Sequence, residues 1–201
     1  MTYIEIIVVL SIFAVLSTVV MFNYGAFQSK IDIKNLASDI ALKIVEAQKS
    51  SSSGKQPLNI VTPADWKPSY GVYFNSTETP PDTDGIALNK KFIYFADVNP
   101  VDTAYTGATT CTIECLGKIL IGKGNKISEI TRCTGVNCPN PTAPANILSH
   151  VAISFSRTKS APVFYSQATL TGFEYVRITV TSPKGNNAYI KIYNSGRIQV
   201  N

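Results

Sequence analysis

The chain has 201 residues, which suits one domain or one domain with an appendage. Apolar residues make up 45% of the chain and charged residues only 15%, against about 25% in a typical globular protein, which argues against a disordered or highly charged protein. The net charge of +5 lies in residues 151–201, where six basic residues face one acidic residue, whereas residues 1–150 are neutral.

The N-terminal region is an almost uninterrupted apolar run. Residues 6–22 read IIVVLSIFAVLSTVVMF, and Glu5 is the one charged side chain before Lys30. A helix needs about 17–25 mainly apolar residues to span a bilayer. The run has no basic segment before it and no small-residue cleavage site, so it is not an ordinary secretory signal. We therefore expect residues 1–25 to form a transmembrane helix.

The first residues, MTYIEIIVVLSIFAVL, closely resemble the mature N-terminus of type IV pilins and pseudopilins, in which a glutamate stands fifth in an apolar segment. The resemblance implies that a prepilin peptidase removes a short leader and that the new amine of Met1 is methylated. It implies that Glu5 pairs with the Met1 amine of a neighbouring copy and sets the axial register during assembly.

The same resemblance implies a set of partners and locations. The partners are other copies of the chain in a helical homopolymer, the pilus assembly machinery, the peptidase and, before assembly, the membrane. The subunit would cross the inner (cytoplasmic) membrane once and then enter an extracellular pilus or an envelope-spanning filament.

Residues 26–54 show helical periodicity with one apolar face. Apolar residues recur at spacings of three and four, and charged residues hold the intervening positions. Ser50–Ser53 and Gly54 end the pattern. We expect residues 1–54 to form one helix of about 50 residues, with its second half packed on a head through Ile31, Ile33, Leu36, Ile40, Ile44 and Ala47.

The periodicity changes from helical to alternating after residue 54, which predicts a β-rich head over residues 55–201. The fold class is therefore α+β, a long helix packed on an antiparallel, sandwich-like head. The predicted strands are 70–74, 91–96, 116–121, 126–132, 151–156, 175–181, 188–193 and 197–200.

Two parts of the head carry a further resemblance. YGVYF at 70–74 followed by FIYFAD at 92–97, and YVRITV at 175–180 followed by AYIKIYNSGRI at 188–198, resemble the head of H-type (FimT-like) pseudopilins. That family packs two antiparallel sheets on the C-terminal half of the long helix.

The four cysteines are Cys111, Cys115, Cys133 and Cys138. An even number outside the cytoplasm favours disulfides. If 116–121 and 126–132 form a hairpin with its turn at 122–125, Cys115 faces Cys133 and Cys111 faces Cys138. We therefore expect a hairpin, 111–138, stapled by these two nested bonds. The local pairing, with Cys111 bonded to Cys115 and Cys133 to Cys138, stays open, as does a zinc site.

No catalytic, phosphate-binding or dinucleotide motif occurs, so we expect neither enzymatic activity nor a cofactor or metal. His150 is expected to be structural or solvent-exposed. Asp82, Asp84 and Asp97 are interpreted as residues of solvated loops.

The basic C-terminal region has two interpretations. Lys191, Arg197, Arg177 and Arg157 could form a solvated charged face, or they could contact a polyanion if they share one surface. FimT-like minor pilins include DNA-uptake receptors, so the alternative to a filament subunit is a minor pseudopilin of a DNA-uptake or type II secretion system that binds DNA or another ligand. A monotopic membrane-anchored module that never polymerises is a third hypothesis.

Overall fold

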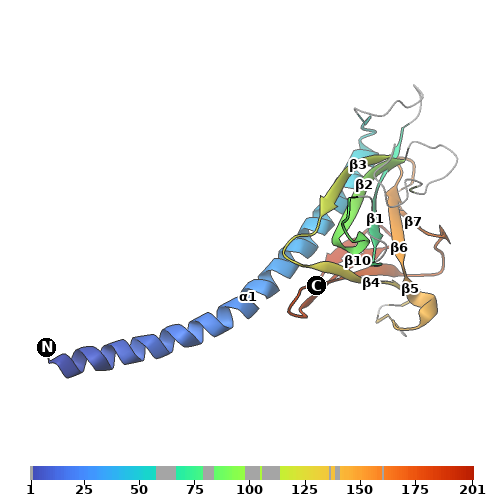
Figure 1. The fold of residues 1–201 in the computed structure, drawn as a ribbon. Coiled ribbons are helices and arrows are strands. Elements are labelled where there is room, and N and C mark those ends of the chain that lie inside the picture. Colours follow the sequence, from blue (N-terminus) through green and yellow to red (C-terminus); the bar gives the residue numbers. More distant parts are fainter. Residues whose placement is uncertain are drawn as a thin grey trace.

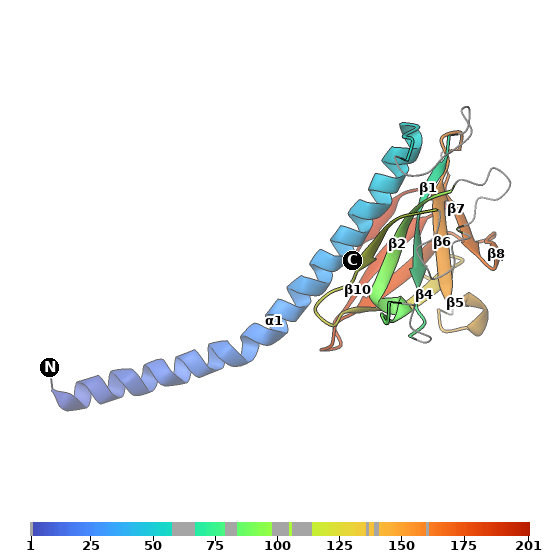
Figure 2. The ribbon, with the colours of Figure 1, turned by 45° about the horizontal axis from the view of Figure 1, so that its top comes forward.

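The computed structural model describes residues 2–57, 67–78, 84–97, 105, 114–135, 137–138, 141–159 and 161–201. The fold is α+β, as predicted: one projecting helix and two antiparallel sheets (Figures 1 and 2). The N-terminal part of the helix extends away from the sheets, and the C-terminal part lies against them.

Helix α1 spans Tyr3–Ser52, and its side chains are described over residues 3–18 and 24–52 and at Met21. The predicted apolar run 6–22 thus includes three residues, 19, 20 and 22, whose side chains lie outside the described part. In the part of the chain that is described, no helix is sufficiently long and apolar to cross a membrane.

The C-terminal end of α1 is closed by a Schellman-type cap. The Gly54 N–H donates to the Ser51 carbonyl at 3.0 Å, and the Lys55 N–H donates to the Ser50 carbonyl at 3.2 Å. Gly54 has a φ of +63°, the left-handed conformation that such caps need and glycine adopts most easily. The predicted helix end at the serine run is therefore confirmed.

The first sheet has six strands in the order β3-β2-β1-β6-β7-β8, and the second has five in the order β11-β10-β9-β4-β5. The strands of the first sheet are β1 (Ser69–Asn75), β2 (Lys91–Asp97), β3 (Cys115–Leu120), β6 (His150–Phe155), β7 (Val163–Ser166) and β8 (Ala168–Thr169). The strands of the second sheet are β4 (Lys126–Cys133), β5 (Ile147–Leu148), β9 (Tyr175–Thr181), β10 (Asn187–Tyr193) and β11 (Ile198–Val200). Two single 3-10 turns, Leu88–Lys90 and Pro144–Asn146, precede β2 and β5.

All eight predicted strands are present, each within two residues of its predicted ends. The sequence reasoning missed β5, β7 and β8, which are short. Two of them, β5 and β8, have only two residues each, too few for an alternating pattern to be recognised.

The main core lies between the helix and the inner faces of both sheets. Ile33, Ile40 and Ile44 of α1 are almost completely buried, and they share one cluster with residues of both sheets: Val72 and Phe74 of β1, Val176 and Ile178 of β9, and Ile190 of β10. The predicted buried face is correct except at Ile31, which is 36% exposed, whereas Ala37 is buried.

The predicted hairpin 111–138 is wrong. β3 pairs with β2 in the first sheet, whereas β4 pairs with β9 and β5 in the second. The turn between them is present, with the Asn125 N–H donating to the Gly122 carbonyl at 3.1 Å, but it carries the chain from one sheet to the other. The two strands that follow one another in sequence therefore do not face one another.

Candidate functional site

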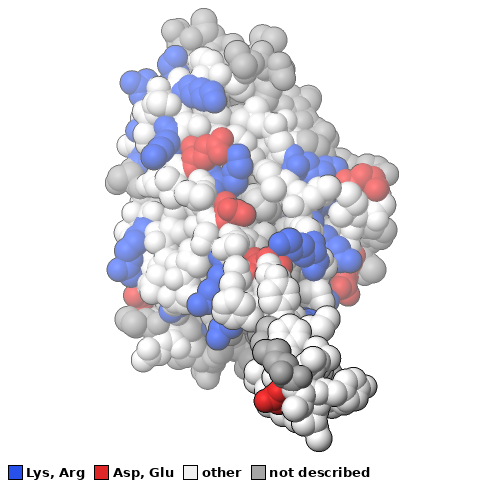
Figure 3. Space-filling model, turned by 90° about the vertical axis from the view of Figure 1, so that its left-hand side faces the viewer, with Lys and Arg blue, Asp and Glu red and all other residues white. Residues whose placement is uncertain are grey.

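The N-terminal half of α1 exposes apolar side chains on every side. From Tyr3 to Leu16 its large apolar side chains are 48–81% exposed. Two hydroxyls of this half bond within the helix: Ser11 Oγ donates to the Val8 carbonyl and Thr18 Oγ1 to the Ala14 carbonyl, both at 2.8 Å. Figure 3, which looks from the helix side toward the head, shows the projecting end as mostly uncharged surface. Nothing in the described part of the chain covers this half of α1, which we call the apolar rod.

Glu5 lies in the first turn of this apolar rod. Its Oε2 accepts the backbone N–H of Thr2 at 2.7 Å, the carboxylate half of a capping box. The carboxylate therefore satisfies one of the N–H groups that a helix start leaves without a partner. The predicted partner, the amine of Met1, lies outside the described residues.

Three large apolar side chains beyond the rod are also exposed, on the side of α1 that points away from the head. Tyr24, Phe27 and Leu42 are 64%, 63% and 66% exposed. At 100° per residue they lie opposite the buried face formed by Ile33, Ile40 and Ile44. The rest of this outer side is mainly polar, with Lys34, Asn35, Ser38, Asp39, Glu46 and Lys49 exposed. The second half of α1 therefore has one continuous apolar face, which the head covers, and a few separate apolar side chains on the other side.

Three of the four predicted polyanion residues lie close together on the outer face of the second sheet. Lys191 of β10 stands directly opposite Arg177 of β9. Each cation lies over a tyrosine ring: Arg177 over Tyr189 at 5.5 Å, Lys191 over Tyr175 at 5.1 Å and Arg197 over Tyr193 at 3.9 Å from the ring centroid. Cation–π contacts of this kind hold the charged heads against the sheet.

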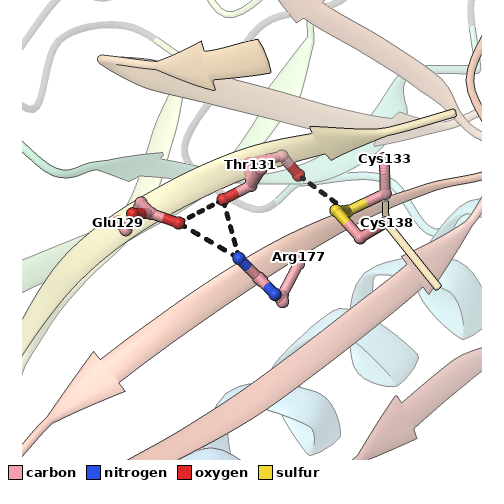
Figure 4. Close-up of a disulfide and its surroundings, with 5 residues drawn as sticks. All are labelled: Glu129, Thr131, Cys133, Cys138 and Arg177. Carbon is pink, nitrogen blue, oxygen red and sulfur yellow. Dashed lines mark hydrogen bonds and ion pairs between the residues drawn. A yellow bond between two sulfur atoms is a disulfide. The ribbon is translucent and has the colours of Figure 1, made fainter. Parts of the chain in front are cut away.

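Arg177 contributes less free charge than the other two. Its Nη2 donates to Glu129 Oε1 at 3.2 Å and to Thr131 Oγ1 at 3.4 Å, and Thr131 Oγ1 in turn donates to the same carboxylate oxygen (Figure 4). Lys191 and Arg197 therefore carry most of the positive charge of this face.

The structure separates the fourth predicted residue, Arg157, from this face. Its guanidinium packs against Gly54 at the C-terminal end of α1, where a Cβ on that glycine would lie 3.4 Å from Nη1. Arg157 also lines a polar cavity with Gln48 and Ser52 of α1. It therefore belongs to the far end of the helix and does not extend the sheet face.

The nested disulfides are also wrong. Cys133 is bonded to Cys138, with their Cα atoms 4.6 Å apart (Figure 4). Cys115 is disulfide-bonded as well, and Cys111 lies outside the described residues. The nested pairing required β3 and β4 to face one another, and they lie in different sheets. The Cys133–Cys138 bond matches the local alternative and packs on Tyr175 and Tyr193, beside the basic face.

The aspartates considered in the sequence analysis form ion pairs, are buried or lie outside the described residues. Asp84 accepts the amines of Lys118 at 2.5 Å and of the almost completely buried Lys91 at 3.1 Å, and these bonds, that of Lys118 first, hold the pKa of its carboxyl well below the usual range. Asp97 is buried at the end of β2, so the solvated loop expected for it is wrong, and Asp82 lies outside the described residues. No group of metal-ligating side chains occurs in the described ranges.

His150 begins β6, and burial lowers its pKa. Its Nδ1 lies 3.0 Å from the Ser149 hydroxyl, and its ring lies against Tyr73 with centroids 5.8 Å apart. These contacts fit the structural role that the sequence suggested for it.

Sequence reasoning did not single out Lys123 and Lys184. They lie in the turn 122–125 and in the turn 182–186 between β9 and β10, and both line one groove against α1 where it leaves the head. The sequence carries no signal that the two turns meet.

No family model, no curated protein and no solved structure matches this chain.

Proposed function

We propose that this protein is a structural subunit of a type IV pilus or pilus-like filament, which assembles through the N-terminal half of α1. The observation that carries the proposal is the apolar rod: its large side chains are 48–81% exposed from Tyr3 to Leu16 in the single chain. Burying one such side chain stabilises by roughly 1.5–3 kcal/mol, so a surface of this kind favours a covered state. The resemblance of the first residues to pilins supports the same reading.

The assembly step transfers the rod from lipid to a bundle of identical rods. Before assembly the rod would lie in the cytoplasmic membrane as a single pass, after a prepilin peptidase has removed a leader and the Met1 amine has been methylated. The two halves of α1 would act as one continuous helix, and the exposed side chains of Phe27 and Leu42 would extend the contact between copies beyond the apolar rod. The β-rich head would face outward.

Glu5 would set the register between copies. A carboxylate and an ammonium taken out of water each carry a desolvation penalty of several kcal/mol, which close pairing offsets. A copy out of register leaves one charge unpaired among apolar helices. The capping bond from the Thr2 N–H adds a second role, because any substitution of Glu5 also affects the start of the helix.

The test compares three versions of residue 5 in cells without a parent copy. Glu5→Val removes both the charge and the cap, whereas Glu5→Gln removes the charge but keeps an oxygen that can accept the Thr2 N–H. We expect Glu5→Val to be processed and inserted normally but to give far less sheared filament per membrane-bound subunit, with Glu5→Gln intermediate. Asp39→Val, which removes an exposed carboxylate in the head-bound half of α1, is the matched control and should assemble.

The outcomes separate the two roles of Glu5. If Glu5→Gln assembles as well as the parent while Glu5→Val does not, capping of the helix is sufficient for assembly, and the proposed pairing of the Glu5 charge with the Met1 amine is wrong. If Glu5→Val assembles as well as the parent, the register mechanism fails altogether.

The basic face of the second sheet favours one alternative, a minor FimT-like pseudopilin that binds DNA. Lys191 and Arg197 lie on one outer face, held over tyrosine rings. Binding to DNA should weaken with salt, with a log–log slope of about −0.9 per phosphate contacted. Lys191→Ala and Arg197→Ala should each reduce that slope, and Arg157→Ala, at the far end of the helix, should leave it unchanged. A salt-independent or absent interaction of the full chain would leave only a solvated face.

A further inference from the structure

Two turns from different parts of the chain close around α1 at the point where it leaves the head. One is the turn 122–125 between β3 and β4, and the other is the turn 182–186 between β9 and β10. Ser29 ties the second turn to the helix, because its Oγ donates to Ser182 Oγ at 3.0 Å and accepts Asn186 Nδ2 at 3.2 Å. Lys123 ties the first, with its Nζ 2.7 Å from Asp32 Oδ1.

The helix and the two turns line an open groove of about 260 Å³. We call its lining the exit collar: Tyr24, Gly25, Gln28, Ser29 and Asp32 of α1, and Lys123, Asn125, Pro183 and Lys184 of the turns. Gly25 lets Lys184 lie against the helix, since a Cβ at this position would be 2.6 Å from Nζ. The collar therefore places a lysine amine directly on the helix surface.

The collar is positively charged once its ion pair is counted. Asp32 is its one carboxylate, and the hydrogen bond from Lys123 lowers the pKa of that carboxyl, so the pair stays ionised and neutral as a whole. Lys184 has no hydrogen bond or ion pair with the described part of the chain. Its amine is thus available to an anion, with the Gln28 and Asn125 amides beside it as further polar groups.

The exit collar lies at the boundary between the two halves of α1. On one side is the apolar rod, and on the other is the half that the head covers. Tyr24 and Phe27 at this level are exposed, and Lys30 is exposed one turn further on. Aromatic and lysine side chains gather at this depth where apolar helices meet the membrane surface.

We propose that the exit collar binds the phosphate of an anionic phospholipid headgroup while the subunit is in the membrane, with Lys184 as its main contact. This inference rests on the membrane stage of the proposed function. The charge of Lys184 and the polar groups around it match a phosphate, and the position beside the apolar rod brings the headgroup layer to the collar. Basic residues near an anionic surface are attracted within a Debye length, and salt weakens the attraction.

The experiment measures how fast each lysine of the full chain reacts with an amine-acylating reagent, read by mass spectrometry. The chain is reconstituted in vesicles of phosphatidylcholine alone and in vesicles that also contain phosphatidylglycerol. Lys184 should react about fivefold more slowly with phosphatidylglycerol present, and added salt should reverse this. Lys159, at the opposite end of the head-bound helix, is the internal control and should react equally in both.

Two variants test the assignment of the contact. Lys123, which is 67% exposed and lines the same collar, is the reporter in these variants and should also react more slowly with phosphatidylglycerol in the parent. Lys184→Gln should lose most of this protection at Lys123, whereas Lys184→Arg, which keeps the charge, should retain it. Inorganic phosphate added to phosphatidylcholine vesicles should give no comparable protection, because the headgroup layer holds phosphate at the collar at a much higher local concentration. Equal protection by free phosphate would overturn the lipid as the occupant.

The failure of this inference differs from the failure of the proposed function. Flotation in a density gradient shows whether the chain is bound to the vesicles. If the chain floats with both kinds of vesicle but Lys184 reacts equally in them, the membrane stage stands and the collar does not bind anionic lipid. If the chain floats with neither, the membrane stage itself fails, and the collar proposal falls with it.

Discussion

The two halves of α1 are both rich in isoleucine, yet their surroundings are opposite. Ile12 is 55% exposed, whereas Ile44 is completely buried between the two sheets. The second half alternates apolar and charged positions and so presents one face to a head of limited width. The first half is apolar on every side, and a head that packs against one side of a helix could not bury all of it. The difference shows that one half of the helix completes the core of its own chain and the other half needs a different partner.

Polar bonds mark the same division. Near the C-terminal end of α1 the Ser51 hydroxyl donates to the Phe155 carbonyl at 2.6 Å, and the Tyr94 hydroxyl donates to Ser50 Oγ at 3.1 Å. Just beyond the helix, the Tyr70 hydroxyl donates to the Lys55 carbonyl at 2.7 Å. In the described part of the apolar rod the side-chain hydrogen bonds stay within the helix.

The largest expected effect comes from the buried half. Ile44→Ala should lower the free energy of unfolding of the head by about 2–5 kcal/mol, because the substitution leaves a cavity where both sheets meet the helix. Ile12→Ala, the matched change in the exposed half, should alter it by less than about 0.5 kcal/mol. Urea unfolding of the chain in detergent, followed by near-ultraviolet circular dichroism, measures both. Equal losses would mean that the two halves do not differ as described.

The next effect is a loss of stability at alkaline pH. Burial, with a smaller contribution from Tyr94, raises the pKa of Tyr70 to about 12 from its ordinary 10.0. Because the folded pKa is the higher one, the stabilisation is fully present below pH 10 and is lost as the pH rises toward 12, by roughly 2 kcal/mol. Tyr70→Phe should make the decline in stability shallower, and Tyr3→Phe, on the exposed rod, should not. If stability declines equally in Tyr70→Phe and the parent, ionisation of the Tyr70 phenol is not the cause of the alkaline loss.

A smaller effect is expected at the bond that joins the helix to β6. Ser51→Ala should cost roughly 1 kcal/mol of unfolding free energy, because the Phe155 carbonyl loses its buried donor. Ser38→Ala removes an exposed hydroxyl that bonds only the Lys34 carbonyl of the same helix, and it should be neutral. Thermal unfolding of the two variants side by side checks the difference, and similar melting temperatures would contradict it.

The smallest effect on the single chain should come from the outer face of the head-bound half. Leu42→Ser replaces a side chain that is 66% exposed, so the free energy of unfolding should change by less than about 0.5 kcal/mol. If copies pack along this face, the same variant should yield less sheared filament than the parent. A normal filament yield would restrict the contact between copies to the apolar rod.

The comparison also explains which predictions succeeded. Strands such as β9 (Tyr175–Thr181) were predicted with their exact ends, because alternation is a local property of the chain. The stapled hairpin failed because strand pairing is not local: the turn 122–125 can close a hairpin or lead to another sheet with the same residues. The disulfide pairing depended on that choice and failed with it. Ile31 failed because helical periodicity gives the spacing of a face but not how wide a surface the head covers.

The sequence by itself determined the α+β class, the extent of the apolar run, the end of the helix at Gly54 and the positions of the main strands, because each depends on the periodicity or the backbone preference of neighbouring residues. Only the tertiary structure decided which strands share a sheet and that Cys133 bonds Cys138. It also decided that Arg177 and Lys191 share a face without Arg157, and that Lys123 and Lys184 line one groove against α1. These depend on contacts between residues far apart in sequence, and such contacts are set by how the two sheets and the helix pack as a whole.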